Sequence, residues 1–505
     1  MIVDTPLGPV RGFEHSNCLA FRGIRYAEAP LGEHRFRPPR PVKPWRDVYD
    51  ATAFGPSAPQ PDMSAADLAL SLPTEPTDED CLFLNVYTPA ADEARRPVLF
   101  WIHGGGYIMG SGCIYDGDAF IREHDVVVVS INYRMGAMGF MHVGHLDPSL
   151  GSSVNNGILD QICALEWVRD NIAAFGGDPG NVLVFGESAG GTSTAMLLGC
   201  PRADGLFHKA VVHSPHVDLI EVGQGHIDFT STCIRRLGGD PEKNGLETLQ
   251  TASVEALTQL ALPDFSDPNA TVEPSLGLRT PDTVTFSPAI DGTLIPDTVA
   301  STIAERGTVP FLGGGCRHEG TLFPMTLGFD EFDEAEAVAL FEQSGCAGRQ
   351  ALTVYENFAP GATPREKLTY ALTDTMFRNS MVRILDAAAT RGTPCWGWMC
   401  AWETDLPGLR ATHAIELPFI WDWINDPTLK SMQTFAGSDA PSSLGRAMRE
   451  YWVSFARNGV PAAAGEPDWP QHELDRRPVL ILDRQRRVVE KFDDEVRALW
   501  FDSSD

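Results

Sequence analysis

Residues 175–190 read Phe-Gly-Gly-Asp-Pro-Gly-Asn-Val-Leu-Val-Phe-Gly-Glu-Ser-Ala-Gly, and this stretch decides the fold. An apolar run, Val182 to Phe185, leads into Gly186-Glu187-Ser188-Ala189-Gly190, and small residues follow. A Gly-x-Ser-x-Gly pattern between a strand and a helix predicts a sharp turn that holds the serine exposed at its tip. The start of the following helix favours negative charge beside Ser188. A purely structural turn is the alternative, and the flanking strand and helix argue against it.

Other apolar runs predict the remaining strands of an α/β sheet. Runs without alternation are expected of parallel strands that helices cover on both faces. We predict strands at residues 97–102, 126–131, 182–185, 209–212, 311–315, 394–402 and 479–482. Residues 160–175 are predicted to form a helix that Gly176 and Gly177 end. The sequence therefore predicts an α/β fold with a central, mostly parallel sheet.

Two long regions exceed what such a sheet needs. Residues 216–305 and 320–393 mix helical patterns with Pro-rich loops, and each precedes a further core strand. We interpret both as cap-like insertions over the site. No internal repeat or linker interrupts the sequence, so residues 1–505 are predicted to form a single domain.

Charge and composition narrow the partners. The formal net charge is −29, whereas nucleic acids and anionic membranes both require a basic face, so neither partner is expected. The sequence shows no basic start followed by an apolar run, and no apolar stretch long enough to span a bilayer. The ten cysteines are dispersed without metal-ligand spacing. We expect free thiols in a cytoplasmic protein, with no metal or organic cofactor.

A second glycine-rich segment, Trp101-Ile102-His103-Gly104-Gly105-Gly106-Tyr107, follows a predicted strand. Glycines let backbone N–H groups approach a bound molecule without interference from a Cβ atom. Beside an elbow of this kind, such a loop stabilises an oxyanion together with the residue after the serine. We therefore predict Gly105, Gly106 and Ala189 as the donors. A simple turn or a phosphate-binding loop is the alternative, and the latter would need Gly-Lys-Ser/Thr.

Chain order limits the choice of the base. An elbow fold places the nucleophile first, then the acid and then the histidine. Five histidines follow Ser188 too closely to leave room for that acid: His208, His213, His216, His226 and His318. His413, in a loop after the predicted strand 394–402, and His472, in an apparent surface turn, remain. Chain order favours His413 without excluding His472.

The acid is less constrained by the pattern. Glu319 follows the predicted strand 311–315 and is the leading candidate. Its task would be to hold the histidine tautomer and to stabilise the charged imidazolium. Asp291, Glu403 and Asp405 are rivals by position, and the pattern alone leaves them open.

Several segments resemble the type-B carboxylesterases, the family that includes the cholinesterases, and imply an α/β-hydrolase fold. The elbow resembles the active-serine signature of that family, and Glu79-Asp80-Cys81-Leu82-Phe83-Leu84-Asn85-Val86-Tyr87-Thr88-Pro89 resembles its second signature. Shorter similar segments include Asn132-Tyr133-Arg134, Asn156-Gly157, Asp160-Gln161, Asp291-Gly292 and Trp469-Pro470. The resemblance covers nearly the whole chain and is weakest in the two insertions.

This resemblance implies roles for individual residues. The acid of the family falls on Glu319 and its base on His413. Glu187 matches a position close to the catalytic histidine. Asp291 matches a fold residue, which weakens it as a rival acid. Cys81 matches a cysteine that is paired in secreted members, but the partner position here is occupied by Ser57-Ala58-Pro59-Gln60 without cysteine, so a free thiol is expected.

The implied activity is hydrolysis of small-molecule carboxylic esters by Ser188, His413 and Glu319 through an acyl-enzyme. No tryptophan occurs between Gln60 and Asp80, where cholinesterases bind quaternary ammonium, so a choline-ester specialist is not expected. Carbamate or amide hydrolysis is the second interpretation, and a non-catalytic binding protein is disfavoured by the complete triad. Three aromatic residues could line an apolar pocket, with ordinary core packing as the alternative: Tyr107, Phe323 and Phe419.

Overall fold

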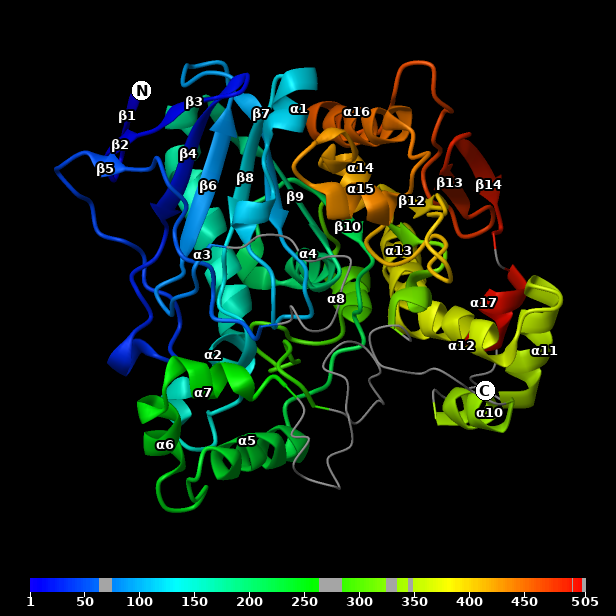
Figure 1. Ribbon diagram of the computed structural model, residues 1–505, viewed down its shortest axis with the longest axis horizontal. Helices are drawn as coiled ribbons and strands as arrows, with labels where there is room; N and C mark the ends of the chain where they lie inside the picture. Colours follow the sequence, from blue (N-terminus) through cyan, green and yellow to red (C-terminus); the bar gives the residue numbers. More distant parts are fainter. Residues whose placement is uncertain (63–74, 263–283, 324–333, 344–347, 493, 502–505) are drawn as a thin grey trace.

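The computed structural model describes residues 1–62, 75–262, 284–323, 334–343, 348–492 and 494–501. Within these residues the chain forms a small sheet of β1 (Ile2–Thr5), β2 (Gly8–Arg11) and β5 (Tyr49–Asp50) and one large sheet (Figure 1). The strands of the large sheet are β3 (Phe13–His15), β4 (Cys18–Arg25), β6 (Phe83–Thr88), β7 (Arg96–Ile102), β8 (Val127–Ile131), β9 (Gly177–Glu187), β10 (Lys209–His213), β11 (Phe311–Cys316), β12 (Cys395–Cys400), β13 (Pro478–Leu482) and β14 (Arg487–Glu490).

The large sheet is parallel at its centre and antiparallel at both edges. Its order is β14-β13-β12-β11-β10-β9-β7-β8-β6-β4-β3. All pairs from β8 to β13 are parallel, whereas β6, β4, β3 and β14 join antiparallel. The predicted α/β class with a mostly parallel sheet is confirmed. All seven predicted strands are present, but residues 394–402 form a strand only from Cys395 to Cys400, and β9 begins earlier than predicted.

Strands β4 and β6, which are central to the antiparallel half, are not among the predicted strands. Strand β6 is buried along its whole length although it contains Asn85 and Thr88, which interrupt the apolar run. Asn85 is satisfied inside the sheet, because it accepts from Gly23 N at 2.9 Å and donates to Ser130 Oγ at 3.1 Å. Strand β4 contains a register shift between Phe21 and Ile24. Apolar runs alone therefore did not predict these strands, because β6 contains buried polar side chains with hydrogen-bond partners and β4 contains a bulge.

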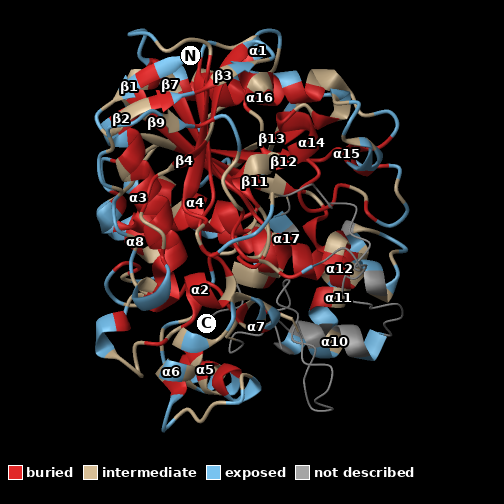
Figure 2. Cartoon of the chain, turned by 60° about the vertical axis from the view of Figure 1, so that its left-hand side comes forward, coloured by how far each residue is buried: buried red, intermediate tan, exposed pale blue. Residues whose placement is uncertain are grey.

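Helices cover both faces of the sheet (Figure 2). One face packs against α3 (Asn156–Asn171), α4 (Ala189–Gly199), α8 (Val299–Arg306) and α13 (Asn379–Arg391). The other packs against α1 (Asp118–Glu123), α14 (Leu417–Ile420), α15 (Lys430–Ala436) and α16 (Ser442–Asn458). Side chains of each central strand alternate between these two cores, which explains the continuous apolar runs.

The predicted helix 160–175 starts earlier and changes form near its end. Helix α3 occupies Asn156–Asn171, and a 3₁₀ turn, Ile172–Phe175, continues it. Gly176 ends this turn with φ 79°, a left-handed conformation that suits glycine. The predicted end of the helical segment is therefore confirmed, and β9 begins at the next residue, Gly177.

The two predicted insertions contain helices of two kinds. Helices α5 (Gln224–Arg236), α6 (Gly245–Thr251), α7 (Val254–Gln259), α10 (Glu334–Gln343), α11 (Gly348–Phe358) and α12 (Pro364–Thr373) lie at the lower periphery in Figure 1. Helices α8 and α13 instead belong to the layer that covers the sheet. The last part of each predicted insertion therefore belongs to the core. A capping role for the rest of the two insertions stays a prediction. The single domain over residues 1–505 also stays a prediction.

Candidate active site

Ser188 lies between the end of β9 and the start of α4, as the elbow pattern predicts. Its backbone has φ 57° and ψ −120°, a conformation rarely adopted by a residue with a side chain. A Cβ atom added to Gly186 would lie 2.5 Å from the carbonyl oxygen of Gly190, and one added to Gly190 would collide with the carbonyl of Ile102. Both glycines are therefore sterically required, and the turn holds Ser188 in a strained position.

The loop after β7 lies against this elbow. A Cβ atom added to Gly104 would lie 3.1 Å from the Cβ atom of Ser188. Gly105 and Gly106 both have positive φ angles, of 107° and 62°. Among the described residues no hydrogen-bond acceptor is found for the N–H groups of Gly105, Gly106 and Ala189. The loop and the start of α4 thus present unpaired backbone donors beside Ser188.

His103, which was not among the predicted site residues, fixes the orientation of this loop. Burial lowers the pKa of His103 to about 4, so the imidazole is neutral near pH 7. Its Nδ1 lies 2.8 Å from the carbonyl oxygen of Gly104, to which it can only donate. The N–H of Gly105 belongs to the same peptide unit and points the opposite way.

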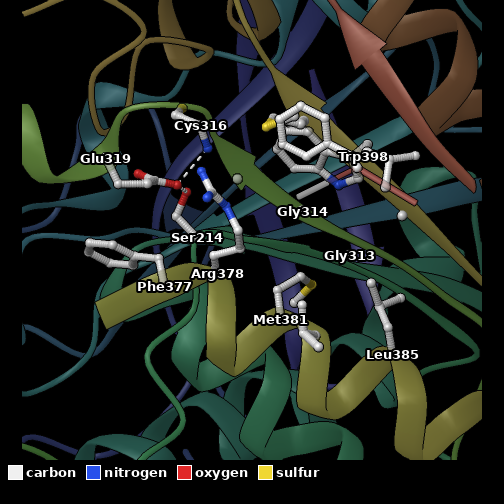
Figure 3. Close-up of a pocket in the computed structure, with 16 residues that line it drawn as sticks. Ser214, Gly313, Gly314, Cys316, Glu319, Phe377, Arg378, Met381, Leu385 and Trp398 are labelled. Carbon is white, nitrogen blue, oxygen red and sulfur yellow. Dashed lines mark hydrogen bonds between the residues drawn. The ribbon is translucent and has the colours of Figure 1, made fainter. Parts of the chain in front are cut away.

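Glu319 and His413 form a short, fully buried pair. Glu319 opens a 3₁₀ turn (Glu319–Thr321) after β11, and His413 lies in the turn before α14. His413 Nδ1 and Glu319 Oε2 are 2.6 Å apart. The other oxygen of Glu319 accepts from Ser214 Oγ at 2.6 Å and from the backbone N–H of Cys316 at 2.5 Å, as Figure 3 shows. Three donors therefore hold the carboxylate of Glu319.

Glu187 lies on the other side of the same imidazole. His413 Nε2 and Glu187 Oε1 are 3.1 Å apart, and both side chains are buried. Burial opposes the charge on His413, but Glu187 and Glu319 outweigh it and raise its pKa to about 9. Burial raises the pKa of Glu187 to about 8 against the attraction of His413. Opposite charges on the two groups therefore stabilise each other at the edge of the elbow.

The predicted nucleophile and base are neighbours that are not hydrogen-bonded to each other. Since Glu187 precedes Ser188 in the chain, its contact with His413 Nε2 places the imidazole beside the elbow. Within the described residues no hydrogen bond joins Ser188 Oγ to His413. Catalytic hydrogen bonds are often long in ligand-free structures and shorten when substrate binds.

The rival residues lie elsewhere. His472 Nε2 pairs with Asp386 at 3.0 Å. Asp291 accepts three backbone N–H groups of its own loop, and Glu403 pairs with Arg410 at 3.2 Å. Asp405 accepts from Ser438. None of these contacts involves His413, so the described geometry brings together the leading candidates and not their rivals.

Aromatic rings surround the imidazole of His413. The ring of Phe377 stacks on it, with centroids 4.6 Å apart and planes 28° apart, and Phe323 lies 5.6 Å away. Tyr107, next to the glycine loop, is within hydrogen-bond distance of Ser193 Oγ, at 3.2 Å. Phe419 is completely buried in the core against Trp402. Phe377 was missed because it comes from a π-helical turn, Asp374–Arg378, whose place in the site depends on tertiary packing.

A second buried carboxylate lies behind the pair. Glu416 accepts from Cys316 Sγ at 3.0 Å, and its other oxygen lies 3.2 Å from His213 Nδ1. Trp452 Nε1 donates to His213 Nε2, so the proton of a neutral His213 lies on Nδ1 and faces Glu416. Contact with His213 and Cys316 lowers the pKa of Glu416 despite its burial. This network joins the ends of β10 and β11 to the segment that carries His413.

A comparison with protein families matches residues 1–500 to the one described as "Carboxylesterase family". The chain belongs to the carboxylesterase family. It is therefore a carboxylic-ester hydrolase of the α/β-hydrolase fold. The expected type-B resemblance is confirmed.

Similar proteins support this assignment over the whole chain. Para-nitrobenzyl esterase of Bacillus subtilis (strain 168) is 34% identical over 507 residues, covering 99% of each chain. Phenmedipham hydrolase of Pseudarthrobacter oxydans is 33% identical over 498 residues, covering 95% of this chain and 94% of the relative. The crystal structure of Geobacillus stearothermophilus carboxylesterase EST55 at pH 6.2 superimposes with a TM-score of 0.86, at 34% identity and 99% coverage of both chains.

The described residues also bear on the cysteines, on metals and on membranes. Cys81 is a buried free thiol, as expected, and so are the other described cysteines except the half-buried free thiol Cys113; Cys346 lies outside the described residues. No cluster of three or more His, Cys, Asp or Glu side chains in the described ranges is arranged to hold a metal ion. Among the described helices, none combines the length and the apolar character that a bilayer crossing requires.

Proposed function

We propose that this carboxylesterase cleaves small-molecule carboxylic esters with Ser188 as nucleophile, His413 as base and Glu319 as the acid that orients it. The observation that carries the proposal is the position of His413, 2.6 Å from Glu319 on one side and beside the elbow on the other. In this mechanism Ser188 Oγ attacks the ester carbonyl while His413 takes its proton. His413 then protonates the leaving alcohol, and a water molecule activated by the same imidazole releases the acid.

The backbone donors beside Ser188 would stabilise the tetrahedral intermediates. Gly105, Gly106 and Ala189 have N–H groups without acceptors among the described residues. Each donor aimed at a developing oxyanion contributes about 3 kcal/mol to lowering the barrier. The position of Ala189 at the start of α4 adds the favourable end of the helix dipole.

Glu187 would act on the base and not on the substrate. Its carboxylate is one of the groups that raise the pKa of His413. An imidazolium forms in the first step, so a negative charge at Glu187 stabilises the protonated base at that moment. The free thiols of the described cysteines accord with a reducing, cytoplasmic location.

The test is the variant Ser188→Ala. We expect loss of p-nitrophenyl butyrate hydrolysis and of covalent labelling by a fluorophosphonate, because both need the serine nucleophile. Ser193→Ala, on the same helix, serves as the matched control and should still be labelled. Wild-type labelling of Ser188→Ala would refute the assignment.

A further inference from the structure

A cavity of about 100 Å³ lies behind Glu319 (Figure 3). Three consecutive glycines of β11, Gly313–Gly315, line it, and so do Met381, Val382 and Leu385 of α13. Ser188 and the glycine loop are not among the residues that line it. The cavity is therefore separate from the surface on which the ester would react.

The glycines of β11 let neighbouring groups pack directly against the backbone of the strand. A Cβ atom on Gly313 would collide with Met381 Sδ, and one on Gly314 would collide with the carbonyl oxygen of Trp398. A Cβ atom on Gly315 would collide with Glu319. The strand therefore contributes only backbone atoms to the wall of the cavity at these three positions.

The walls are mainly apolar and include three aromatic rings, those of Phe377, Trp398 and Phe492. Polar side chains are confined to one end, at Ser214, Glu319 and Arg378. Ser214 donates to Glu319, whereas Arg378 donates to Asp374 at 2.6 Å and to the carbonyl of Arg317 at 3.0 Å. Because the charged groups already have partners, the cavity offers no counter-charge to an ionic ligand.

We propose that this cavity binds one small, neutral aromatic molecule of about the size of benzene. An apolar cavity of roughly 150 Å³ in another protein takes up benzene or xenon, so a volume of about 100 Å³ admits at most a single six-membered ring. Replacing weakly held water by apolar surface favours binding, and aromatic walls add edge and face contacts. The binding itself does not depend on the proposed catalytic roles.

Phe377 connects this cavity to the site. Its ring lines the cavity and also stacks on His413, with 4.6 Å between centroids. Glu319, which lies within hydrogen-bond distance of Nδ1 of that imidazole, lies at the polar end of the cavity. A molecule in the cavity would press Phe377 against His413 and restrict the imidazole, which must move between Ser188 and the leaving group. This consequence rests on the proposed function.

The binding test uses fluorobenzene with the full-length protein. We expect saturable one-site binding in ¹⁹F NMR and an upward shift of the melting temperature that grows with ligand concentration. The signal should persist after Ser188 has been blocked with a fluorophosphonate, since Ser188 does not line the cavity. Loss of binding after this block would place fluorobenzene in the ester site and overturn the proposal.

Two variants fill the cavity from the same helix. Leu385→Trp adds the larger volume, and Val382→Phe changes a half-buried residue that tolerates substitution more easily. Both should abolish the fluorobenzene signal, whereas Thr390→Phe, at an exposed position of α13, should keep it. Retention of binding in a folded Val382→Phe protein would refute the proposed site.

The coupling to His413 has its own readout. In wild-type protein, saturating fluorobenzene should lower kcat for p-nitrophenyl butyrate and leave KM unchanged, and Val382→Phe should lose this response. A rise in KM without a change in kcat would contradict action through Phe377. If the fluorophosphonate fails to label Ser188, the proposed function fails, but the binding results with Val382→Phe and Thr390→Phe still decide whether the cavity is a site.

Discussion

Glu319 and Glu187 are identical buried side chains on opposite sides of His413, yet their surroundings differ. Glu319 accepts from His413, Ser214 and the backbone N–H of Cys316. Glu187 has His413 at 3.1 Å, and its Oε1 makes no hydrogen bond of good geometry among the described residues. Donors favour the ionised form of a buried carboxyl group, and their scarcity favours the neutral form. Burial with few donors raises the pKa of Glu187, whereas the three donors to Glu319 hold its side chain in one position.

The largest effect is expected from Glu319→Gln, which replaces the carboxylate that accepts from three donors by a neutral amide. An amide keeps the shape but no longer stabilises the correct imidazole tautomer, so kcat/KM should fall by about 10,000-fold, as for other triad acids. The measurement is steady-state hydrolysis of p-nitrophenyl butyrate. Glu403→Gln, a more exposed glutamate paired with Arg410, is the matched control and should retain wild-type activity.

A smaller loss is expected from Ser214→Ala, which makes the surroundings of Glu319 more like those of Glu187. It removes one of three donors to Glu319, and a hydrogen bond to a charged group contributes about 1.5–3 kcal/mol. We expect kcat to fall at least about tenfold, with little change in KM. Ser153→Ala removes a buried hydroxyl that accepts from Val143 N, far along the chain, and serves as control. An unchanged kcat would show that Ser214 has no part in holding the acid.

The mildest effect is expected from Glu187→Gln, which changes the carboxylate next to Nε2 of His413. The carboxylate of Glu187 raises the pKa of His413, so its removal should lower that pKa. A base with a lower pKa stays deprotonated to lower pH, and the acid limb of the kcat/KM profile should shift toward lower pH. A profile measured between pH 5 and 10 tests this. An unmoved or oppositely moved acid limb would contradict the role proposed for Glu187.

Much of this site could be predicted from short-range patterns. The elbow and the glycine loop are local in sequence, because their geometry depends on where glycines are sterically required. Chain order reduced the choice of base to His413 and His472. The resemblance then selected Glu319 and His413, which the structure places 2.6 Å apart.

The supporting residues could not be predicted in the same way. Ser214 reaches Glu319 only because β10 and β11 are neighbours in the sheet. Phe377 reaches His413 from a π-helical turn that no apolar period marks. Strand β6 was hidden because Asn85 is satisfied by Gly23 and Ser130, which are distant in sequence. In each case the deciding contact joins separate segments of the chain.

The close packing of Gly190 on the carbonyl of Ile102 has a mechanical consequence. Ile102 ends β7, from which the glycine loop departs, and Gly190 lies in the first turn of α4, just after Ser188. With no side chain between them, the serine and the loop must shift as one rigid piece. A mild denaturant should therefore abolish fluorophosphonate labelling and transition-state-analogue binding at the same concentration. For a protein engineer, substrate range is then better altered at the rings beside His413, those of Phe323 and Phe377, than on this backbone junction.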